Sequence, residues 1–138
     1  MILMSELLKG KKEEDLTQDV KDNLQKLLVT INKVRALYGQ PMIVTSCVRT
    51  MSEHLAIYAK KGITDKSKIP MKSKHLYGLA VDIADPDGKL KEWCLQNEAA
   101  LREIGVWMEA FESTPNWVHF QCVQYGSYKE GGSLWFKP

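Results

Sequence analysis

One long amphipathic helix is the feature that most constrains this fold. Between residues 17 and 41, apolar side chains recur every three or four positions, which places them on one face of a helix. The stripe consists of Val20, Leu24, Leu27, Leu28, Ile31, Val34 and Leu37. Thr17 can cap the start, Gly39 can end the helix, and Pro41 prevents its continuation. The pattern predicts a helix over residues 18–38 whose apolar face must pack against other elements.

Short β-prone runs supply a surface against which such a helix can pack. They are rich in β-branched or aromatic residues and lie at 42–46, 79–83, 106–108 and 117–123. Two further helices are expected at 51–61, with Ser52 as N-cap, and at 89–104. Residues 113–116 join the last two runs, as in a hairpin. This order of elements predicts an α+β fold, with an antiparallel β-sheet and helices packed on one side of it.

The chain of 138 residues has room for one hydrophobic core. Residues 1–16 are rich in Lys and Glu and lack sustained periodicity, so we expect an N-terminal arm that is mobile or forms a loosely docked helix. Residues 17–138 then form a single domain. Its tail, 126–138, contains three glycines and should be mostly loop.

Composition argues against several classes of partner. The formal net charge is +2, which leaves no broad electrostatic field for nucleic acid or an anionic membrane. No apolar run approaches the roughly 18 residues of a membrane span, and the first four residues are too short for the apolar part of a signal peptide. We therefore expect cytoplasmic synthesis without a signal peptide. The three cysteines form an odd set without motif spacing, which favours buried thiols over disulfides or ligands.

Two of the three histidines lie beside or within β-prone runs, where a polar ring is unusual. His75 precedes Asp82 by seven positions, and Gly78 between them allows the backbone to turn. Asp82 has apolar neighbours, and a buried carboxylate is costly unless it is paired or binds a metal. His119 stands in a similarly apolar run. Two imidazoles and a carboxylate can hold a catalytic zinc ion, although spacing alone favours hydrogen-bonded core residues.

The motif around these residues resembles that of a known peptidase family. The run Ser73-x-His75-x-x-Gly78-x-Ala80-x-Asp82-Ile83, followed by Trp117-Val118-His119, is similar to the zinc-dependent peptidoglycan peptidases of the D-alanyl-D-alanine carboxypeptidase group. That group includes phage L-alanyl-D-glutamate endopeptidases and shares its fold with the Hedgehog signalling domain. The likeness covers about residues 15–138. Because the motif fixes several positions of different chemical type, a chance match is much less likely than for a lone glycine pattern.

The resemblance implies roles for the residues that match. His75, Asp82 and His119 match the three zinc ligands of the family. Arg49 matches an arginine whose permanent charge stabilises the oxyanion that forms as a peptide carbonyl is attacked. Without the resemblance, a surface arginine would be the simpler interpretation.

Four other residues receive weaker assignments. Ser73 is expected either to bind substrate or to support the loop before the first ligand. Tyr77 and Trp117 are expected to line a substrate cleft, with plain core aromatics as the alternative. The third histidine, His54, is expected to face solvent or to contribute to local packing, without a functional role.

The general base is where the chain departs from the family pattern. Many relatives carry Glu or Asp three residues before the last histidine, but Asn116 stands there, and an amide cannot exchange a proton in this way. If the run at 106–109 pairs antiparallel with the next one, Glu109 lies opposite His119 on the same face. We therefore expect Glu109 to act as the base, with Glu112 as the second candidate and solvated surface acids as the alternative for both.

The function implied by the resemblance is hydrolysis of a peptide bond in bacterial peptidoglycan stem peptides, with Zn²⁺ as cofactor. The enzyme would be a monomeric, endolysin-like carboxypeptidase or endopeptidase that reaches the wall through lysis, a holin pore or a virion. Nucleic acid and membranes are not expected partners. Two alternatives stay open. One is a catalytically impaired Hedgehog-like zinc-binding module, which Asn116 favours, and the other is a structural component of a phage.

Overall fold

Helix α2 (Gln18–Tyr38) has the limits that its apolar stripe predicts. In the computed structural model, which describes residues 1–138, the Thr17 hydroxyl accepts a hydrogen bond from the Val20 N–H. Gly39 ends the helix in the left-handed conformation, with a φ of 73°. The side chains that the helix buries most deeply are Leu24, Leu27, Ile31 and Val34. The prediction for this helix is confirmed at both ends and along most of its apolar face, but Leu37 at its last turn is 54% exposed.

Five strands form one sheet in the order β1-β2-β4-β3-β5. Their bounds are β1 (Val44–Ser46), β2 (Ala80–Ala84), β3 (Trp107–Glu109), β4 (Trp117–Gln121) and β5 (Trp135–Phe136). The first four pair antiparallel, and β3 and β4 form the expected hairpin. Strand β5 pairs parallel to β3 and comes from the tail that was expected to be mostly loop. A strand of two residues is too short to show an alternating pattern, so the sequence gives no sign of it.

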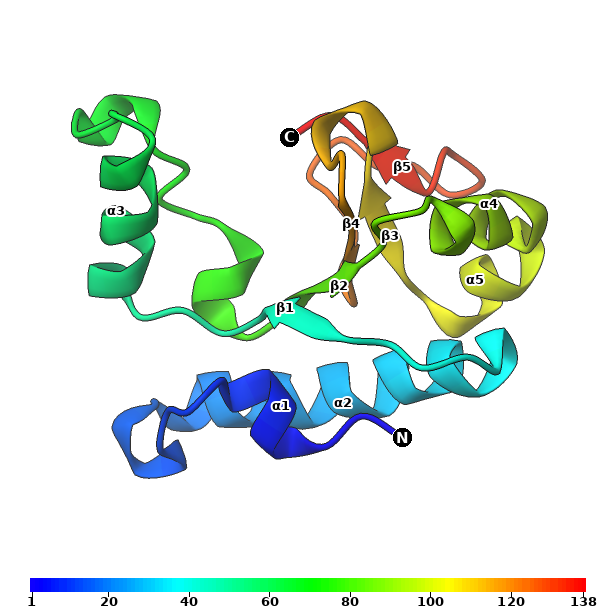
Figure 1. Cartoon of the computed structure of the whole chain (residues 1–138), viewed down its shortest axis with the longest axis horizontal. Helices are drawn as coiled ribbons and strands as arrows, with labels where there is room; N and C mark the ends of the chain where they lie inside the picture. The colour runs from blue at the N-terminus through cyan, green and yellow to red at the C-terminus, as the bar shows by residue number, and fades with distance from the viewer.

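Alternation along the strands gives the sheet two chemically distinct faces. One face is apolar, fully buried and joined to the stripe of α2 through the residues Val81, Ile83, Met108, Val118 and Phe120. Helix α2 lies along one side of the sheet, with α1 beside it (Figure 1). The intervening residues of β2 and β4, including Asp82 and His119, point to the other face. An α+β fold with helices packed against one face of an antiparallel sheet is therefore confirmed.

The N-terminal segment contains helix α1 (Met4–Leu8), one of the two expected alternatives, but it contributes to the core instead of docking loosely. Leu7 is fully buried and Ile2 nearly so. The backbone N–H and C=O of Ile2 also form two hydrogen bonds with the Asn32 side-chain amide, of 2.7 and 3.0 Å. A loosely attached arm is thus not what the structure contains at residues 2–8. One buried side chain in a helix of five residues, with a second just before the helix, is too little to produce a readable periodicity.

The three remaining helices flank the sheet. Helix α3 (Met51–Lys60) stands to the left of the sheet in Figure 1, and α4 (Lys89–Gln96) and α5 (Glu98–Ile104) to its right. The N-cap of α3 is Thr50 rather than Ser52, because Thr50 and Glu53 form a reciprocal capping box. None of the helices combines the length and apolar character that a membrane crossing requires.

A single helix over residues 89–104 was expected, but Asn97 divides it. The Asn97 side-chain amide donates to the Trp93 carbonyl, while its backbone N–H bonds to the Cys94 carbonyl. The side chain thus takes the acceptor that the backbone of a continuous helix would use. The break produces α4 and α5.

All three cysteines are buried and free, as their odd number and spacing predict. Burial raises the pKa of the Cys47 and Cys94 thiols to about 12. Such thiols stay protonated at neutral pH and make poor ligands or nucleophiles.

Candidate metal centre

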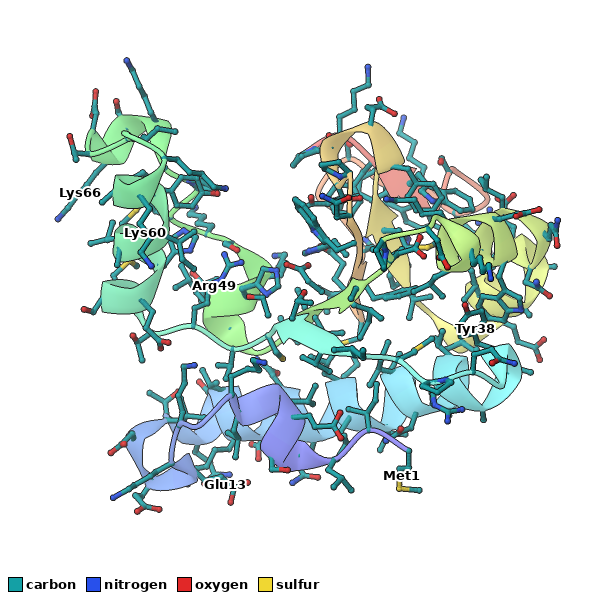
Figure 2. All side chains as sticks on the ribbon, viewed as in Figure 1. Met1, Glu13, Tyr38, Arg49, Lys60 and Lys66 are labelled. Atoms are coloured by element: carbon teal, nitrogen blue, oxygen red, sulfur yellow. The ribbon has the colours of Figure 1, made fainter.

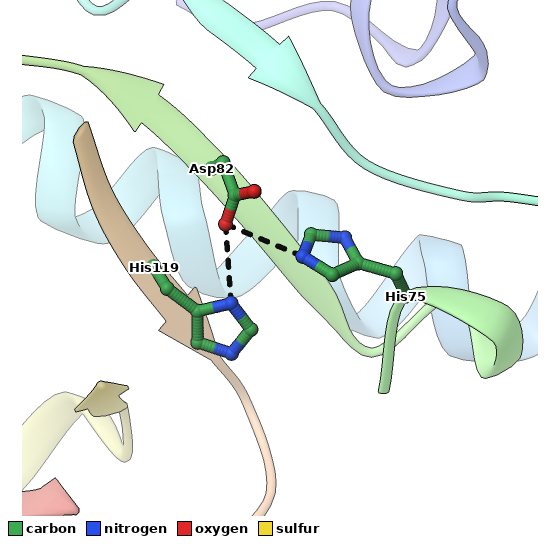
Figure 3. Close-up of side chains that lie close together, drawn as sticks. All are labelled: His75, Asp82 and His119. Atoms are coloured by element: carbon green, nitrogen blue, oxygen red, sulfur yellow. Dashed lines mark hydrogen bonds and ion pairs between the residues drawn. The ribbon is translucent and has the colours of Figure 1, made fainter. Parts of the chain in front are cut away.

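Three elements bring the two histidines and the aspartate together, as Figure 3 shows. His75 comes from the short helix η3 (Lys74–Tyr77), Asp82 from β2 and His119 from β4. Asp82 and His119 are directly paired in the ladder, which places both on the same face of the sheet. The segment that contains His75 then folds back over that face.

Gly78 fixes the return of the chain from η3 to β2. Its φ is 72°, and a Cβ added there would lie 3.0 Å from Leu24 Cγ and 3.1 Å from the Val20 carbonyl oxygen. Only glycine combines this conformation with so close an approach to α2. Ser73 starts η3 by accepting a hydrogen bond from the His75 N–H. Local turn chemistry thus sets the position of the first ligand.

The three donor atoms lie close together in a buried setting. His119 Nδ1 is 3.1 Å and His75 Nε2 is 3.3 Å from Asp82 Oδ1. One ligand atom from each residue lies within 4.8 Å of the others. The exposed fractions of the three residues are 4%, 7% and 4% in chain order. This spacing suits one small cation contacted by all three residues.

Hydrogen bonds on the far side of each imidazole fix which nitrogen faces the centre. His75 Nδ1 lies 2.8 Å from the Cys47 carbonyl oxygen, which can only accept, so this nitrogen carries the proton. His119 Nε2 lies 2.9 Å from Gln121 Oε1. The Gln121 amide cannot be reversed without loss, because its nitrogen donates to the Val123 carbonyl.

When both rings are neutral, as zinc binding requires, they direct two lone pairs at the same carboxylate oxygen. His75 presents Nε2 and His119 presents Nδ1, each backed by an outer acceptor. Three electron-rich atoms at this separation repel one another unless a cation lies between them. Neutral imidazole and carboxylate are also the preferred ligands of Zn²⁺, and outer acceptors of this kind are usual in zinc sites. The donor set thus fits a zinc ion.

Electrostatics keep the carboxylate ready to bind a cation. Burial alone would raise the pKa of Asp82, but hydrogen bonds that His119 and His75 donate in the metal-free protein outweigh burial and hold that pKa well below its usual range. Burial alone would lower the pKa of His119, but its hydrogen bond to Asp82 and the charge of Glu109 raise it overall. Asp82 is therefore ionised at neutral pH.

Arg49 and Glu109 flank the centre from different sides. Arg49 lies between α3 and the sheet (Figure 2), with Nη2 3.9 Å from Asp82 Oδ2. Glu109 Oε1 lies 3.6 Å from His119 Nδ1, and its side chain is 23% exposed. The β3–β4 register pairs Met108 with Phe120, and its continuation by one residue puts Glu109 opposite His119, as strand alternation predicts.

The other expected site residues take varied positions. Ser73 supports the loop, since its hydroxyl is bonded to the His75 backbone. Tyr77 is exposed on η3, and Trp117 is half-buried on β4, two residues before His119. Glu112 is exposed in η4 (Phe111–Ser113), and its carboxylate makes no hydrogen bond or ion pair. The structure thus brings Glu109, and not Glu112, to the metal ligands.

Three residues of the site were not expected from the sequence: Ser46, His54 and Gln121. Gln121 follows His119 by two positions, so strand alternation alone could have placed both on the same face. Ser46 Oγ accepts hydrogen bonds from Arg49. His54 was expected to lack a functional contact, but it is fully buried and also contacts Arg49. Nothing in local sequence separates these two from ordinary polar residues.

The arrangement defines a class of protein: a metallohydrolase-type α+β domain whose single zinc centre has two imidazole ligands and one carboxylate ligand. A model of the family described as Peptidase M15 matches residues 2–121. The chain therefore belongs to the peptidase M15 family, whose members are zinc-dependent peptidases. The match includes α1 and all three ligands. No curated protein and no solved structure gives a significant match to the chain.

Proposed function

We propose that this zinc peptidase hydrolyses a peptide bond in the stem peptides of bacterial peptidoglycan, as a carboxypeptidase or an endopeptidase. The observation that carries the proposal is the pair of outer hydrogen bonds that aim His75 Nε2 and His119 Nδ1 at Asp82, with Glu109 3.6 Å from the same His119 nitrogen. A metal site that served stability alone would not need a partly exposed carboxylate beside a ligand.

His75, Asp82 and His119 would hold the zinc ion. When bound, zinc supplies Lewis acidity, which polarises the substrate carbonyl and makes water easier to deprotonate. Two charged side chains lie next to these ligands: Arg49, 3.9 Å from Asp82 Oδ2, and Glu109, 3.6 Å from His119 Nδ1. The chain's own residues then have two tasks: to stabilise the negative charge that develops on the carbonyl oxygen, and to accept the proton of the attacking water.

Arg49 is suited to the developing charge. Its guanidinium is permanently charged, largely buried and close to Asp82. A donor in this position stabilises the carbonyl oxygen as it becomes negative during attack, and a donor of this type is worth about 10²- to 10³-fold in kcat.

Glu109 is suited to the proton. It would take a proton from the attacking water and return it to the leaving amine, as a general base and then a general acid. Asn116 is exposed before β4 and cannot perform this exchange. Glu112 would have to reach the centre from η4, so it ranks second.

The experiment is digestion of defined muropeptides by purified protein, with products identified by mass spectrometry. Wild-type protein should release one new amino terminus at a single bond type, and His75→Ala should abolish both release and zinc binding. Glu112→Gln serves as a matched control and should remain active. Full activity in His75→Ala would contradict the proposal.

A second candidate function is a zinc-binding module without turnover, and Asn116 is the observation that favours it. The module is supported if wild-type protein releases product only at background level and if Glu109→Gln and Glu112→Gln each retain zinc and release the same amount. The resemblance to a group that includes phage endopeptidases also supports an endolysin-like role. That role predicts lysis of a susceptible bacterium on induction together with a membrane-permeabilising protein.

A further inference from the structure

His54 lies in the first turn of α3 and is fully buried. Its Nε2 is 2.8 Å from the Pro70 carbonyl oxygen, and its Nδ1 is 3.4 Å from Arg49 Nη1. The ring also packs edge-on against Tyr58, with 5.1 Å between centroids. A buried imidazole with a separate partner at each nitrogen has a fixed orientation.

These partners determine where the proton of His54 lies. The Pro70 carbonyl can only accept a hydrogen bond, so Nε2 must carry the proton. Arg49 can only donate, so Nδ1 must be unprotonated and accept. In a doubly protonated ring, the N–H at Nδ1 would face an N–H of Arg49 Nη1 and the two would repel. Burial lowers the pKa of His54, in agreement with a neutral ring, although the bond to Pro70 opposes that shift.

His54 and Ser46 together hold every nitrogen of the Arg49 guanidinium. Ser46 Oγ accepts from Nε at 3.3 Å and from Nη2 at 3.1 Å, while His54 Nδ1 accepts from Nη1. Each terminal nitrogen still has a second N–H. A free arginine side chain has about 2 kcal/mol of rotamer entropy to lose when it binds, and prior restraint removes part of that cost.

The same contacts connect the arginine to the first metal ligand. The Arg49 backbone N–H donates to the His75 carbonyl at 3.1 Å. Pro70, which bonds to His54, lies in the segment that leads to His75. The His54 imidazole therefore connects three segments: α3, the residues that follow β1 and the residues that precede η3.

We propose that His54 is a positioning residue for the hydrolysis. In its neutral Nε2–H form, it holds the Arg49 guanidinium toward the metal centre, with its spare N–H groups directed at the substrate oxygen. The inference rests on the proposed function, in which Arg49 stabilises the oxyanion. It assigns a role to a residue that contacts neither the metal ligands nor the reacting atoms.

The kinetic test compares His54→Leu with His54→Asn. Leucine approximates the volume of the histidine side chain but cannot make its hydrogen bonds to Arg49 and Pro70. Asparagine can, through its Oδ1, replace Nδ1 as the acceptor for Arg49. For zinc-loaded protein, His54→Leu should lower kcat by about 10²-fold, the size expected for a misplaced catalytic group, with little change in KM. His54→Asn should recover most of the loss. In an Arg49→Gln background, His54→Leu should have no further effect, whereas independent, additive losses would overturn the proposal.

A second readout does not depend on activity. Arg35 and Arg102 are the other arginines of the chain and serve as internal references. Phenylglyoxal should modify Arg49 faster in His54→Leu than in wild type, relative to both references, as measured by mass spectrometry of peptides. An unchanged relative rate would overturn the proposal.

A third measurement uses wild-type protein, so it holds even if a variant fails to fold. The ¹⁵N NMR shifts of His54 should show a protonated Nε2 and an unprotonated Nδ1 at neutral pH, and a protonated Nδ1 would overturn the proposal. If wild-type protein cleaves no muropeptide, the proposed function fails. The modification rate and the tautomer still decide whether His54 holds Arg49.

Discussion

Replacing Gln121 with leucine should weaken zinc binding without changing any ligand. Gln121 Oε1 accepts the only hydrogen bond of His119 Nε2, at 2.9 Å, and His119 is 4% exposed. Gln121→Leu would leave this N–H buried and unpaired, which costs about 1 to 3 kcal/mol. It would also free the ring to rotate away from Asp82.

The expected loss of zinc affinity follows from the same contact. Removing an outer partner of a metal-binding histidine typically costs about 10- to 100-fold in affinity. This factor corresponds to about 1.4 to 2.8 kcal/mol, which agrees with the cost of the unpaired N–H. The cost of the unpaired N–H and the expected loss of zinc affinity thus have the same magnitude.

The assay is a competition titration of metal-free protein against a chromophoric zinc chelator. Gln124→Leu is the matched control, because Gln124 is the same residue type three positions along and is exposed. The control should bind zinc like wild type. An affinity of Gln121→Leu within twofold of wild type would refute the view that the outer hydrogen bond orients His119.

Three further changes test other parts of the account. Glu109→Gln should retain zinc and lower kcat by about 10²- to 10⁴-fold in muropeptide digestion, whereas Glu112→Gln should stay near wild type; equal losses would remove the distinction between them. Zinc affinity, measured by chelator titration, should fall as the pH drops through the pKa of His119, because protons compete with zinc for Nδ1. Since the pKa of His119 is raised, the loss of affinity should begin above the ordinary histidine pKa of about 6.5. Backbone strain alone should lower the free energy of unfolding of Gly78→Ala by about 1 to 2 kcal/mol. The measured loss in urea should be larger, because the added Cβ would also collide with α2. Gly88→Ala, at a similar φ in open space, should show the strain alone, and equal effects would argue against the close contact.

The elements that the sequence predicts well are those with long or redundant patterns. Helix α2 repeats its apolar spacing over 21 residues, which is about six helical turns, and has a cap signal at both ends. The position of Glu109 also followed from the sequence, because strand alternation and an antiparallel hairpin fix which residues face each other. Local rules thus imply the place of Glu109 beside His119, whereas the assignment of His75, Asp82 and His119 as ligands came from the family resemblance.

The features that were missed depend on contacts between distant segments. The burial of Ile2 requires Asn32 on α2, and the role assigned to His54 requires both Arg49 and the Pro70 carbonyl. The break at Asn97 comes from a side chain that competes with its own helix, which average propensities do not reveal. No local pattern contains this information.

The central claim is that one zinc ion, held by His75, Asp82 and His119, is required for peptide-bond hydrolysis. The most direct measurement is a titration of metal-free protein with zinc while product release from a defined muropeptide is followed by mass spectrometry. The account predicts no release without zinc and a linear rise that ends at about one equivalent, the stoichiometry of a single three-ligand site. Full release by the metal-free protein, or a rise that continues to a second equivalent, would contradict it.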